Sequence, residues 1–325
     1  SPQRYCCNMF WAARARVGIG AGLVLSAWSS DATPERVTIP TGVSMRAAAE
    51  SLGGVGLIRW PSLFSAYAKV RRADRGIKPG TYLIPKNAGW SAILGMLRGG
   101  GSANAVLIPE GYRVAQIESL LVAKVGLSAD SVAAAVRDTA LLRRLDVPTP
   151  TLEGYLFPDT YFFPPGTSAR VAVQTMVRRF EQQWQPEWKA RADSMTLSRH
   201  DILTLASIVE REAKLNEERP IIAAVYLNRL RKGMKLEADP TVQYALPQYQ
   251  SRLLFKHLRV QSPYNTYIHK GLPPGPIGAP GVASIRASLY PADVQFLYFV
   301  AFPDGHHEFR VRLEQHQLAA RQARR

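Results

Sequence analysis

The sequence contains very little cysteine, and the cysteine it has lies at one place. Among its 325 residues only Cys6 and Cys7 are cysteines, and because they are adjacent they join no distant parts of a fold. Two thiols are also too few for a metal site with four cysteine ligands. Folding is therefore expected to be independent of the redox state of the surroundings.

The N-terminal part contains one apolar run, Val17 to Trp28 (VGIGAGLVLSAW), which is shorter than the roughly 20 residues of a spanning helix. Arg14 and Arg16 precede it and polar residues follow, an arrangement typical of an export signal or a signal anchor. A buried helix is the alternative, which Pro34 disfavours because it separates the run from the rest of the chain. We expect residues 1–33 to form a signal or anchor segment.

The sequence has few acidic residues relative to its basic ones. Forty-one Lys and Arg against 25 Asp and Glu give a net charge of +16, which attracts nucleic acid, anionic lipid or an acidic wall polymer. The basic residues are scattered and no nucleic-acid-binding motif is present, so no nucleic-acid partner is expected. With 46% apolar and 20% charged residues the chain has a globular composition.

Residues 34–104 alternate short apolar strands with amphipathic helices. The expected elements are a strand at Val37–Ile39, a helix capped by Ser44, a helix carrying Leu63, Tyr67 and Val70, a strand at Thr81–Ile84 and a helix at Ser91–Leu97. The first four elements make a small β-α-α-β module. The glycine-rich stretch that ends at Asn104 is a natural linker.

Residues 105–325 form a longer unit that is rich in helices. The expected elements are a strand at Val106–Ile108, helices at Arg113–Val125, Val171–Trp188, Arg199–Lys214 and Pro220–Arg231, a hairpin that pairs Phe296–Ala301 with Phe309–Val311, and a basic helix at Leu313–Arg325. The predicted fold class is therefore α+β, with a small β-α-α-β module followed by a larger mixed α/β domain.

One helix of the longer unit carries two candidate acids. Ser198 and Asp201 fit the Ser-x-x-acid capping pattern at its start. At 100° per residue the apolar side chains form one stripe, and Glu210 and Glu212 fall on its two edges, each about 80° from its centre. The stripe comprises Ile202, Leu205, Ala206 and Val209, and the opposite side comprises Thr204, Ser207 and Arg211.

A carboxylate at the edge of an apolar stripe is partly desolvated, which raises its pKa toward the range that a general acid needs. Helix geometry does not choose between Glu210 and Glu212. It is equally compatible with two boundary glutamates that have no catalytic role.

Three loops, at residues 153–160, 237–244 and 263–276, are unusually dense in polar and aromatic side chains. Proteins hold sugars with aromatic faces and with planar amide or carboxylate hydrogen bonds. Alternatively, the Asp and Asn residues shape turns and the aromatic residues belong to the core. His306 and His307 are expected to lie in an exposed turn.

Five segments, taken together and in this order, resemble the YceG-like family of endolytic murein transglycosylases. They are LEGYLFPDTY, LASIVEREA, VYLNRLRKGMKLEADPTVQYAL, SPYNTYIHKGLPPGPIGAPG and LYFVAFPDGHHEF, and the resemblance extends from Val37 to Leu318. Five ordered matches are far more specific than one short motif. The resemblance implies a LysM-like module at residues 34–104 and a catalytic domain at residues 105–325.

The resemblance also selects one of the two glutamates. The family's catalytic glutamate is the second one in the helix motif Ile-(Ile/Val)-Glu-(Lys/Arg)-Glu, which is Glu212 here. The implied reaction cuts the β-1,4 bond between MurNAc and GlcNAc in nascent peptidoglycan strands, leaves 1,6-anhydro ends and terminates strand elongation. It implies no metal or other cofactor. Candidates for binding substrate are Glu153, Asp159, Asn228, Asp239, Thr241, Asn265 and Tyr267.

The resemblance further implies a location. The family usually has one N-terminal membrane-spanning helix, which places the enzyme at the outer face of the cytoplasmic (inner) membrane. The corresponding segment here departs from this pattern, since it is short and contains Arg14 and Arg16. The expected partners are peptidoglycan glycan strands, the cytoplasmic membrane and peptidoglycan synthases.

Two other functions stay open at this point. A hydrolase would use Asp239 or Glu153 as a second carboxylate that activates water, and its products would be one water heavier than anhydro ends. A non-catalytic glycan-binding protein would rely on the LysM-like module and would cut nothing.

Overall fold

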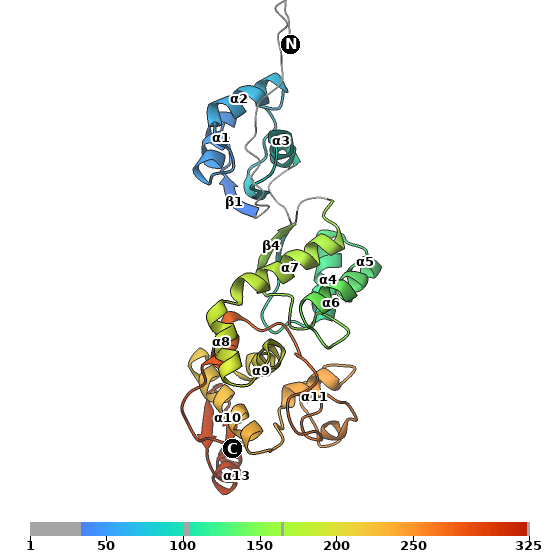
Figure 1. Ribbon diagram of the computed structural model, residues 1–325, viewed down its shortest axis with the longest axis vertical. Helices are drawn as coiled ribbons and strands as arrows, with labels where there is room; N and C mark the ends of the chain where they lie inside the picture. The colour runs from blue at the N-terminus through green and yellow to red at the C-terminus, as the bar shows by residue number, and fades with distance from the viewer. Residues whose placement is uncertain (1–33, 100–103, 164–165, 324–325) are drawn as a thin grey trace, which may run out of the picture.

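The computed structural model describes residues 34–99, 104–163 and 166–323. A small N-terminal module lies at one end of the molecule, and a larger region continues from it (Figure 1). The expected signal or anchor segment (residues 1–33) and most of the expected linker (residues 100–103) lie outside the described residues. Among the helices that are described, none combines the length and the apolar character needed to cross a bilayer.

The N-terminal module packs helices around a two-stranded sheet. Its elements are β1 (Pro34–Ile39), α1 (Met45–Gly54), α2 (Pro61–Val70), β2 (Gly80–Pro85) and α3 (Trp90–Gly99). β1 pairs antiparallel with β2, with Val37 opposite Tyr82. Leu52, Phe64 and Ile84 are completely buried, so the module has an apolar core of its own. The expected β-α-α-β order is confirmed, with α3 following it.

The buried face of α2 differs from the one that the sequence pattern predicts. Leu63 and Val70 are exposed, at 57% and 82% of their surface, whereas Phe64 and Ala68 are fully buried. Phe64 meets Trp90 edge to face, with 5.6 Å between the ring centroids. An aromatic ring removes more apolar area from water than Leu or Val, so Phe64 determines which face of α2 turns inward.

The first half of the larger region places helices beside a second short sheet. β3 (Asn104–Leu107) pairs antiparallel with β4 (Thr160–Phe163). The helices are α4 (Val114–Val125), α5 (Ala129–Ala135), α6 (Thr139–Arg144), α7 (Ala169–Gln183) and α8 (Pro186–Ser194). They share one apolar core with this sheet and with the first half of α9.

The single helix expected over Val171–Trp188 is instead two helices. α7 ends at Gln183, and α8 begins at Pro186. A proline in a helix interior removes an N–H and clashes with the preceding turn, whereas the first turn of a helix accepts it. Pro186 therefore starts a new helix and does not extend α7.

The second half of the larger region surrounds α9. Its elements are α9 (Arg199–Glu212), the 3-10 turn η1 (Asn216–Glu218), α10 (Arg219–Arg231), α11 (Asp239–Ala245), the 3-10 turn η2 (His257–Arg259), α12 (Val282–Leu289), β5 (Tyr298–Ala301), β6 (His307–Arg310) and α13 (Leu313–Gln322). β5 and β6 form an antiparallel hairpin with Ala301 opposite His307, which confirms the expected pairing.

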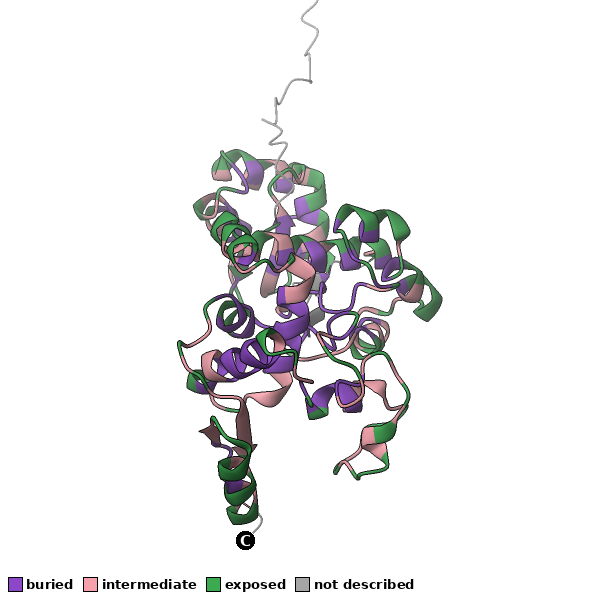
Figure 2. Cartoon of the chain, turned by 60° about the horizontal axis from the view of Figure 1, so that its bottom comes forward, coloured by how far each residue is buried: buried purple, intermediate pink, exposed green. Residues whose placement is uncertain are grey.

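The middle of α9, from Ile202 to Val209, is buried on all sides, and the central helices are largely purple in Figure 2. It packs against α10, α11 and α12. Thr204 and Ser207, which the sequence pattern places opposite the apolar stripe, are 1% and 0% exposed. Burial is possible because their hydroxyls have partners: Thr204 donates to the His200 carbonyl at 2.7 Å, and Ser207 accepts from the Ile277 N–H at 2.9 Å.

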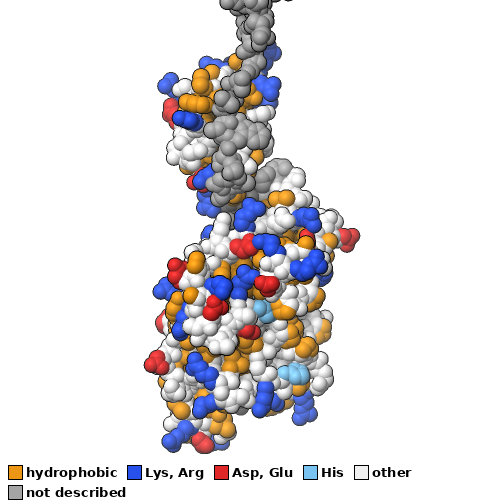
Figure 3. Space-filling model, in the orientation of Figure 1, with side chains coloured by type: hydrophobic (Ala, Val, Ile, Leu, Met, Phe, Trp, Pro, Cys, Tyr) orange, Lys and Arg blue, Asp and Glu red, His pale blue; other side chains and the backbone are white. Residues whose placement is uncertain are grey.

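Lys and Arg side chains are distributed over the visible face of both regions and do not gather in one patch (Figure 3). Several of them pair with carboxylates, as Arg144 does with Glu181 and Arg179 with Asp159. The distribution agrees with the scatter of basic residues along the sequence.

We predict that Gly154→Ala destabilises the protein more than Gly126→Ala. Both glycines have a left-handed backbone, with φ of +80° and +77°, so either alanine costs about 1 kcal/mol of strain. A Cβ at Gly154 would lie 2.4 Å from the Pro276 Cβ, whereas a Cβ at Gly126 meets nothing within 4 Å. The clash adds about 1–3 kcal/mol, measurable by urea denaturation followed by tryptophan fluorescence. Equal losses for the two variants would contradict the packing described between residues 154 and 276.

Candidate active site

The ends of α9 follow from its local sequence. Ser198 and Asp201 form the expected capping box: the Ser198 hydroxyl accepts from the Asp201 N–H at 3.0 Å, and the Asp201 carboxylate accepts from the Ser198 N–H at 2.9 Å. At the other end the backbone becomes extended at Ala213. Glu212 is therefore the last helical residue of α9.

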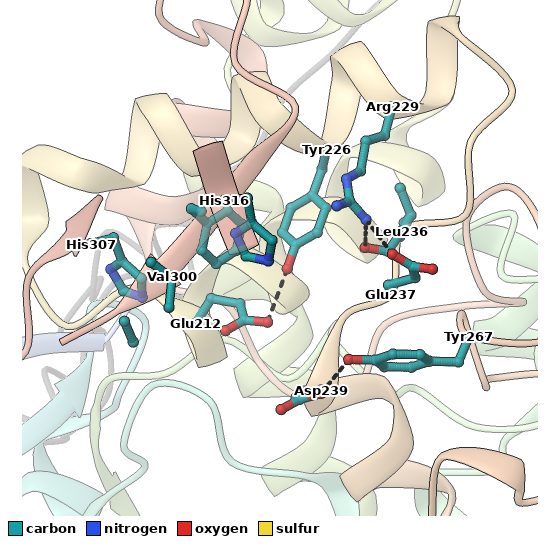
Figure 4. Close-up of a pocket in the computed structure, with 12 residues that line it drawn as sticks. Glu212, Tyr226, Arg229, Leu236, Glu237, Asp239, Tyr267, Val300, His307 and His316 are labelled. Carbon is teal, nitrogen blue, oxygen red and sulfur yellow. Dashed lines mark hydrogen bonds and ion pairs between the residues drawn. The ribbon is translucent and has the colours of Figure 1, made fainter. Parts of the chain in front are cut away.

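Glu212 lines a cavity of about 300 Å³ between α9, α10, the start of α11, the β5–β6 hairpin and α13. The lining residues are Glu212, Tyr226, Arg229, Leu236, Glu237, Asp239, Tyr267, Phe299, Val300, Ala301, His307 and His316. In Figure 4 the Glu212 carboxylate lies between His307 on one side and Asp239 on the other.

The Glu212 carboxyl has one hydrogen-bond partner and no ion-pair partner among the described residues. The Tyr226 hydroxyl donates to its Oε1 at 2.9 Å. The pKa of Glu212 is raised to about 7, chiefly by burial and to a smaller extent by the negative charge of Asp239, against the lowering effects of the Tyr226 hydrogen bond and the Arg211 charge. Burial is the larger effect, so near pH 7 the group is present in both protonation states.

Glu210, two residues earlier on the same helix, has a different environment. Its Oε1 pairs with Arg219 at 2.8 Å, and its Oε2 accepts from the Gly281 N–H at 3.0 Å. The Glu210 and Arg219 side chains are 6% and 9% exposed. Both carboxylate oxygens are therefore engaged inside the protein, and Glu210 is absent from the cavity lining.

The other side of the cavity is organised by two polar pairs. The Tyr267 hydroxyl donates to Asp239 at 2.7 Å, and burial together with the Asp239 charge raises the pKa of Tyr267 far above its ordinary value. The Tyr267 hydroxyl therefore remains a donor at neutral pH. Arg229 pairs with Glu237 at 3.1 Å. A carboxyl group with a pKa near 7, flanked by donors and acceptors in a cavity, is suited to general acid and base catalysis.

Comparison with known proteins identifies the family to which this site belongs. The sequence profile of the YceG-like family matches residues 37–322. The chain belongs to the YceG-like family. The resemblance carried by the five sequence segments is thereby confirmed.

Curated relatives of this YceG-like chain carry one name. A Bacillus subtilis (strain 168) protein named endolytic murein transglycosylase is 34% identical over 304 residues, which cover 88% of this chain and 84% of the relative. A Streptococcus pneumoniae (serotype 2, strain D39) protein of the same name is 29% identical over 297 residues. That match covers 82% of this chain and 54% of the relative, so the chain spans about half of the pneumococcal protein.

A solved structure supports the family's fold for this chain. The 2.6 Å crystal structure of a yceG-like protein from Listeria monocytogenes superposes with a TM-score of 0.62 at 33% sequence identity. The superposition covers 88% of this chain and 99% of that one. The mixed arrangement of helices and small antiparallel sheets is thus shared with an experimentally determined relative.

Of the seven residues that the sequence suggests for substrate binding, two line the cavity in this YceG-like chain. They are Asp239 and Tyr267. The other five lie outside its lining and have partners elsewhere: Glu153, Asp159, Asn228, Thr241 and Asn265.

Glu153 and Asp159 hold together the first half of the larger region. Glu153 accepts from the Val114 N–H at 3.0 Å and from the Tyr244 hydroxyl at 3.3 Å, and burial raises its pKa to about 7. Asp159 pairs with Arg179 at 2.7 Å. These contacts support the start of α4 and the approach of α7.

Asn228, Thr241 and Asn265 fix backbone segments around the cavity. The Asn228 amide donates to the Val294 carbonyl at 2.8 Å, and the Asn265 amide donates to the Val260 carbonyl at 2.9 Å. The Thr241 hydroxyl is completely buried and hydrogen-bonds within the turn that opens α11. Each of the three satisfies backbone groups that would otherwise be unpaired.

Sequence reasoning missed two residues of the cavity that contact or face Glu212. Tyr226 lies on α10, and no pattern in the sequence links it to the end of α9. His307, expected in an exposed turn with His306, is instead 7% exposed and lies on β6. Alternation along a strand could have indicated this, because His307 shares a face with Phe309, two residues later.

We predict that two substitutions shift the pKa of Glu212 in opposite directions. Tyr226→Phe removes a hydrogen bond to the carboxylate and raises the pKa by about one unit or more. Asp239→Asn removes a nearby negative charge and lowers it. Carbon-13 NMR titration of the glutamate carboxyls measures both shifts, with Glu212→Gln to assign the signal. Shifts in the same direction would contradict this electrostatic description.

We also predict that Glu212→Gln stabilises the protein at alkaline pH. The unfolded chain titrates Glu212 near its ordinary pKa of about 4.5, whereas the folded protein holds it protonated up to about 7. The contribution of protonated Glu212 to wild-type stability is therefore complete below pH 4.5 and is lost as the pH rises through 7.

The unfolding free energy of Glu212→Gln should match wild type at pH 4 and exceed it by about 2–3 kcal/mol at pH 8. Urea denaturation at both pH values measures the difference, from which the titration of Glu153 cancels because both proteins retain it. A difference that does not change with pH would contradict the raised pKa of Glu212.

Proposed function

We propose that the chain is an endolytic peptidoglycan lytic transglycosylase. It cleaves the β-1,4 bond between MurNAc and GlcNAc in nascent glycan strands, leaves 1,6-anhydroMurNAc ends and so terminates strand elongation. The observation that carries the proposal is Glu212, a carboxyl with a pKa of about 7 in an open cavity of a YceG-like chain. The name shared by the curated relatives supports the same activity.

Glu212 is proposed as the catalytic acid and base. Protonated Glu212 donates its proton to the bridging oxygen, the bond to C1 of MurNAc breaks, and an oxocarbenium-like transition state develops. The 6-hydroxyl of the same MurNAc attacks C1, and its proton passes to the Glu212 carboxylate. No water is consumed, and Glu212 returns to its protonated form.

The environment of Glu212 favours this role over the same role for Glu210. The carboxylate of Glu210 is held by Arg219 and by the Gly281 N–H, so both of its oxygens are engaged inside the protein. Among the residues that the structure describes, Glu212 has the Tyr226 hydroxyl as its one hydrogen-bond partner, and it faces the cavity. A group with a pKa near the working pH donates and accepts protons most effectively.

Asp239 and Tyr267 are proposed to contact the glycan, because both line the cavity with Glu212 and present a carboxylate and a phenol. Glu153, Asp159, Asn228, Thr241 and Asn265 are proposed to act indirectly, by supporting the segments around the cavity. Their intramolecular hydrogen bonds and ion pairs support this division.

The proposed domain organisation is a LysM-like module at residues 34–104 and a catalytic domain at residues 105–325, after an N-terminal signal or anchor segment. The separate apolar core of the N-terminal module and its β-α-α-β order support the first boundary. The proposed location of the catalytic domain is the extracytoplasmic side of the cytoplasmic membrane, beside peptidoglycan synthases. The net charge of +16 suits anionic lipid and wall polymers.

A hydrolase is the second candidate, because Asp239 provides another carboxylate in the same cavity as Glu212. It would direct a water to C1 in place of the 6-hydroxyl. The masses of the products separate the two reactions, since a hydrolysed end weighs one water more than an anhydro end.

We predict that the wild-type chain converts uncrosslinked glycan strands into fragments with anhydro ends, and that Glu212→Gln reduces the rate about 10²–10⁴-fold. Glu217→Gln is the matched control, because Glu217 is an exposed glutamate of η1 and is absent from the cavity lining. Mass spectrometry of the fragments measures both the rate and the type of end.

Three results would overturn parts of the proposal. Equal activity of wild type and Glu212→Gln would remove Glu212 from the reaction. Reducing ends in place of anhydro ends would favour the hydrolase. Binding of strands without any cleavage would leave a glycan-binding protein.

A further inference from the structure

A buried pair of residues, His307 and Glu218, joins the β5–β6 hairpin to η1 beside the Glu212 cavity. The His307 Nδ1 lies 2.6 Å from Glu218 Oε2, and the His307 backbone N–H donates to Glu218 Oε1 at 2.8 Å. Both residues are 7% exposed. Two hydrogen bonds from one residue to one carboxylate fix the position of the histidine as well as its ring.

This contact determines which ring nitrogen of His307 carries a hydrogen. A carboxylate only accepts hydrogen bonds, so Nδ1 must be the donor in the pair. In the neutral ring the other nitrogen, Nε2, then has a free lone pair. Nε2 has no hydrogen-bond partner among the residues that the structure describes, and His307 lines the cavity that Glu212 enters.

Packing prevents the ring from turning away. Phe299 of β5 meets the His307 ring edge to face, with 5.3 Å between the centroids. The Phe309 ring, on the same face of β6, lies beside the His307 ring with 6.2 Å between the ring centroids. The imidazole is thus held between two aromatic rings and a carboxylate.

Most other polar groups of the cavity are already engaged. Asp239 accepts from Tyr267, Glu237 pairs with Arg229, and Tyr226 donates to Glu212. His316 also lines the cavity, but its Nδ1 is buried without a partner and no described contact fixes its tautomer. His307 is therefore a nitrogen lone-pair acceptor whose ring position and tautomer the protein sets.

We propose that His307 is the base of the transglycosylation: its Nε2 accepts the proton of the MurNAc 6-hydroxyl during the attack on C1. This inference rests on the proposed function and reassigns one of the two proton transfers given to Glu212 there. The bond from O6 to C1 forms and the bond from C1 to the bridging oxygen breaks. Glu212 gives its proton to that oxygen, and the O6 proton goes to Nε2.

The Glu218 carboxylate stabilises the imidazolium that this transfer creates, since it lies against Nδ1–H. After product release, water returns His307 to its neutral form and Glu212 to its protonated form. Separating acid and base between two residues allows each to be in the required state before the reaction begins.

The first test replaces His307 by asparagine in the full chain. The asparagine amide can still donate to Glu218 from near the Nδ1 position, so the hairpin keeps its anchor while the pocket loses Nε2. We expect kcat on glycan strands to fall about 10²-fold with KM little changed and the melting temperature preserved. His306→Asn is the matched control: His306 is adjacent, pairs with Asp304 and lies outside the cavity lining, so activity should be unchanged.

The second test separates the acid from the base. The substrate is a glycan oligosaccharide whose terminal MurNAc carries 4-nitrophenol at C1, a leaving group that departs without a proton. If His307 is the base, Glu212→Gln should release 4-nitrophenolate and form the anhydro end at a rate within about tenfold of wild type, whereas His307→Asn should remain slow. The comparison of Glu212→Gln with wild type on this substrate still tests the inference if His307→Asn fails to fold.

Two outcomes would overturn the inference about His307. His307→Asn that stays folded and cleaves strands within twofold of wild type overturns the inference. So does Glu212→Gln that stays inactive on a 4-nitrophenyl substrate that wild type cleaves. If wild type does not cleave that substrate, the strand assay decides alone. A wild type that forms no anhydro ends from strands refutes the proposed function itself.

Discussion

The buried ion pair between Glu210 and Arg219 is the contact on which the geometry of the active region depends. Glu210 also accepts from the Gly281 N–H at the start of α12, and Arg219 at the start of α10 also donates to Ser284 at 2.9 Å. One carboxylate and one guanidinium thereby join α9, α10 and α12. Removing one partner of such a buried pair costs about 3–5 kcal/mol, because the other charge is left without compensation. These contacts therefore fix the position of the C-terminal end of α9, where Glu212 is the last helical residue.

This arrangement gives two neighbouring glutamates opposite properties. The charge of Glu210 is neutralised inside the protein, so the ion pair contributes to the fold. Glu212 accepts from a neutral donor, the Tyr226 hydroxyl, and burial is the main cause that raises its pKa to about 7. Keeping a carboxyl in such a position costs stability above that pKa, since the charged form is poorly solvated. A residue suited to proton transfer thus lies two positions from the ion pair that joins α9, α10 and α12.

The sequence predicted the elements well wherever local rules decide them. The capping box of Ser198 and Asp201, the β5–β6 hairpin and the β-α-α-β order of the first module are all present. It failed where packing overrides local periodicity. The inward face of α2 is set by Phe64, and the hydroxyls of α9 are buried because neighbouring segments satisfy them. The break before α8 follows from Pro186, a local signal that helical periodicity alone obscured.

The sequence by itself determined the family and, through the helix motif, which of two glutamates is the candidate acid. Helix periodicity could not separate Glu210 from Glu212, since both lie at equal angles from the apolar stripe. Tertiary structure decided what surrounds them: Arg219 and Gly281 at Glu210, and Tyr226, Asp239 and His307 around the Glu212 cavity. It also placed five of the seven suggested substrate-binding residues outside that cavity. The physical reason is that burial and charge act through space, between helices and loops far apart in the chain, whereas a motif records only neighbours along it.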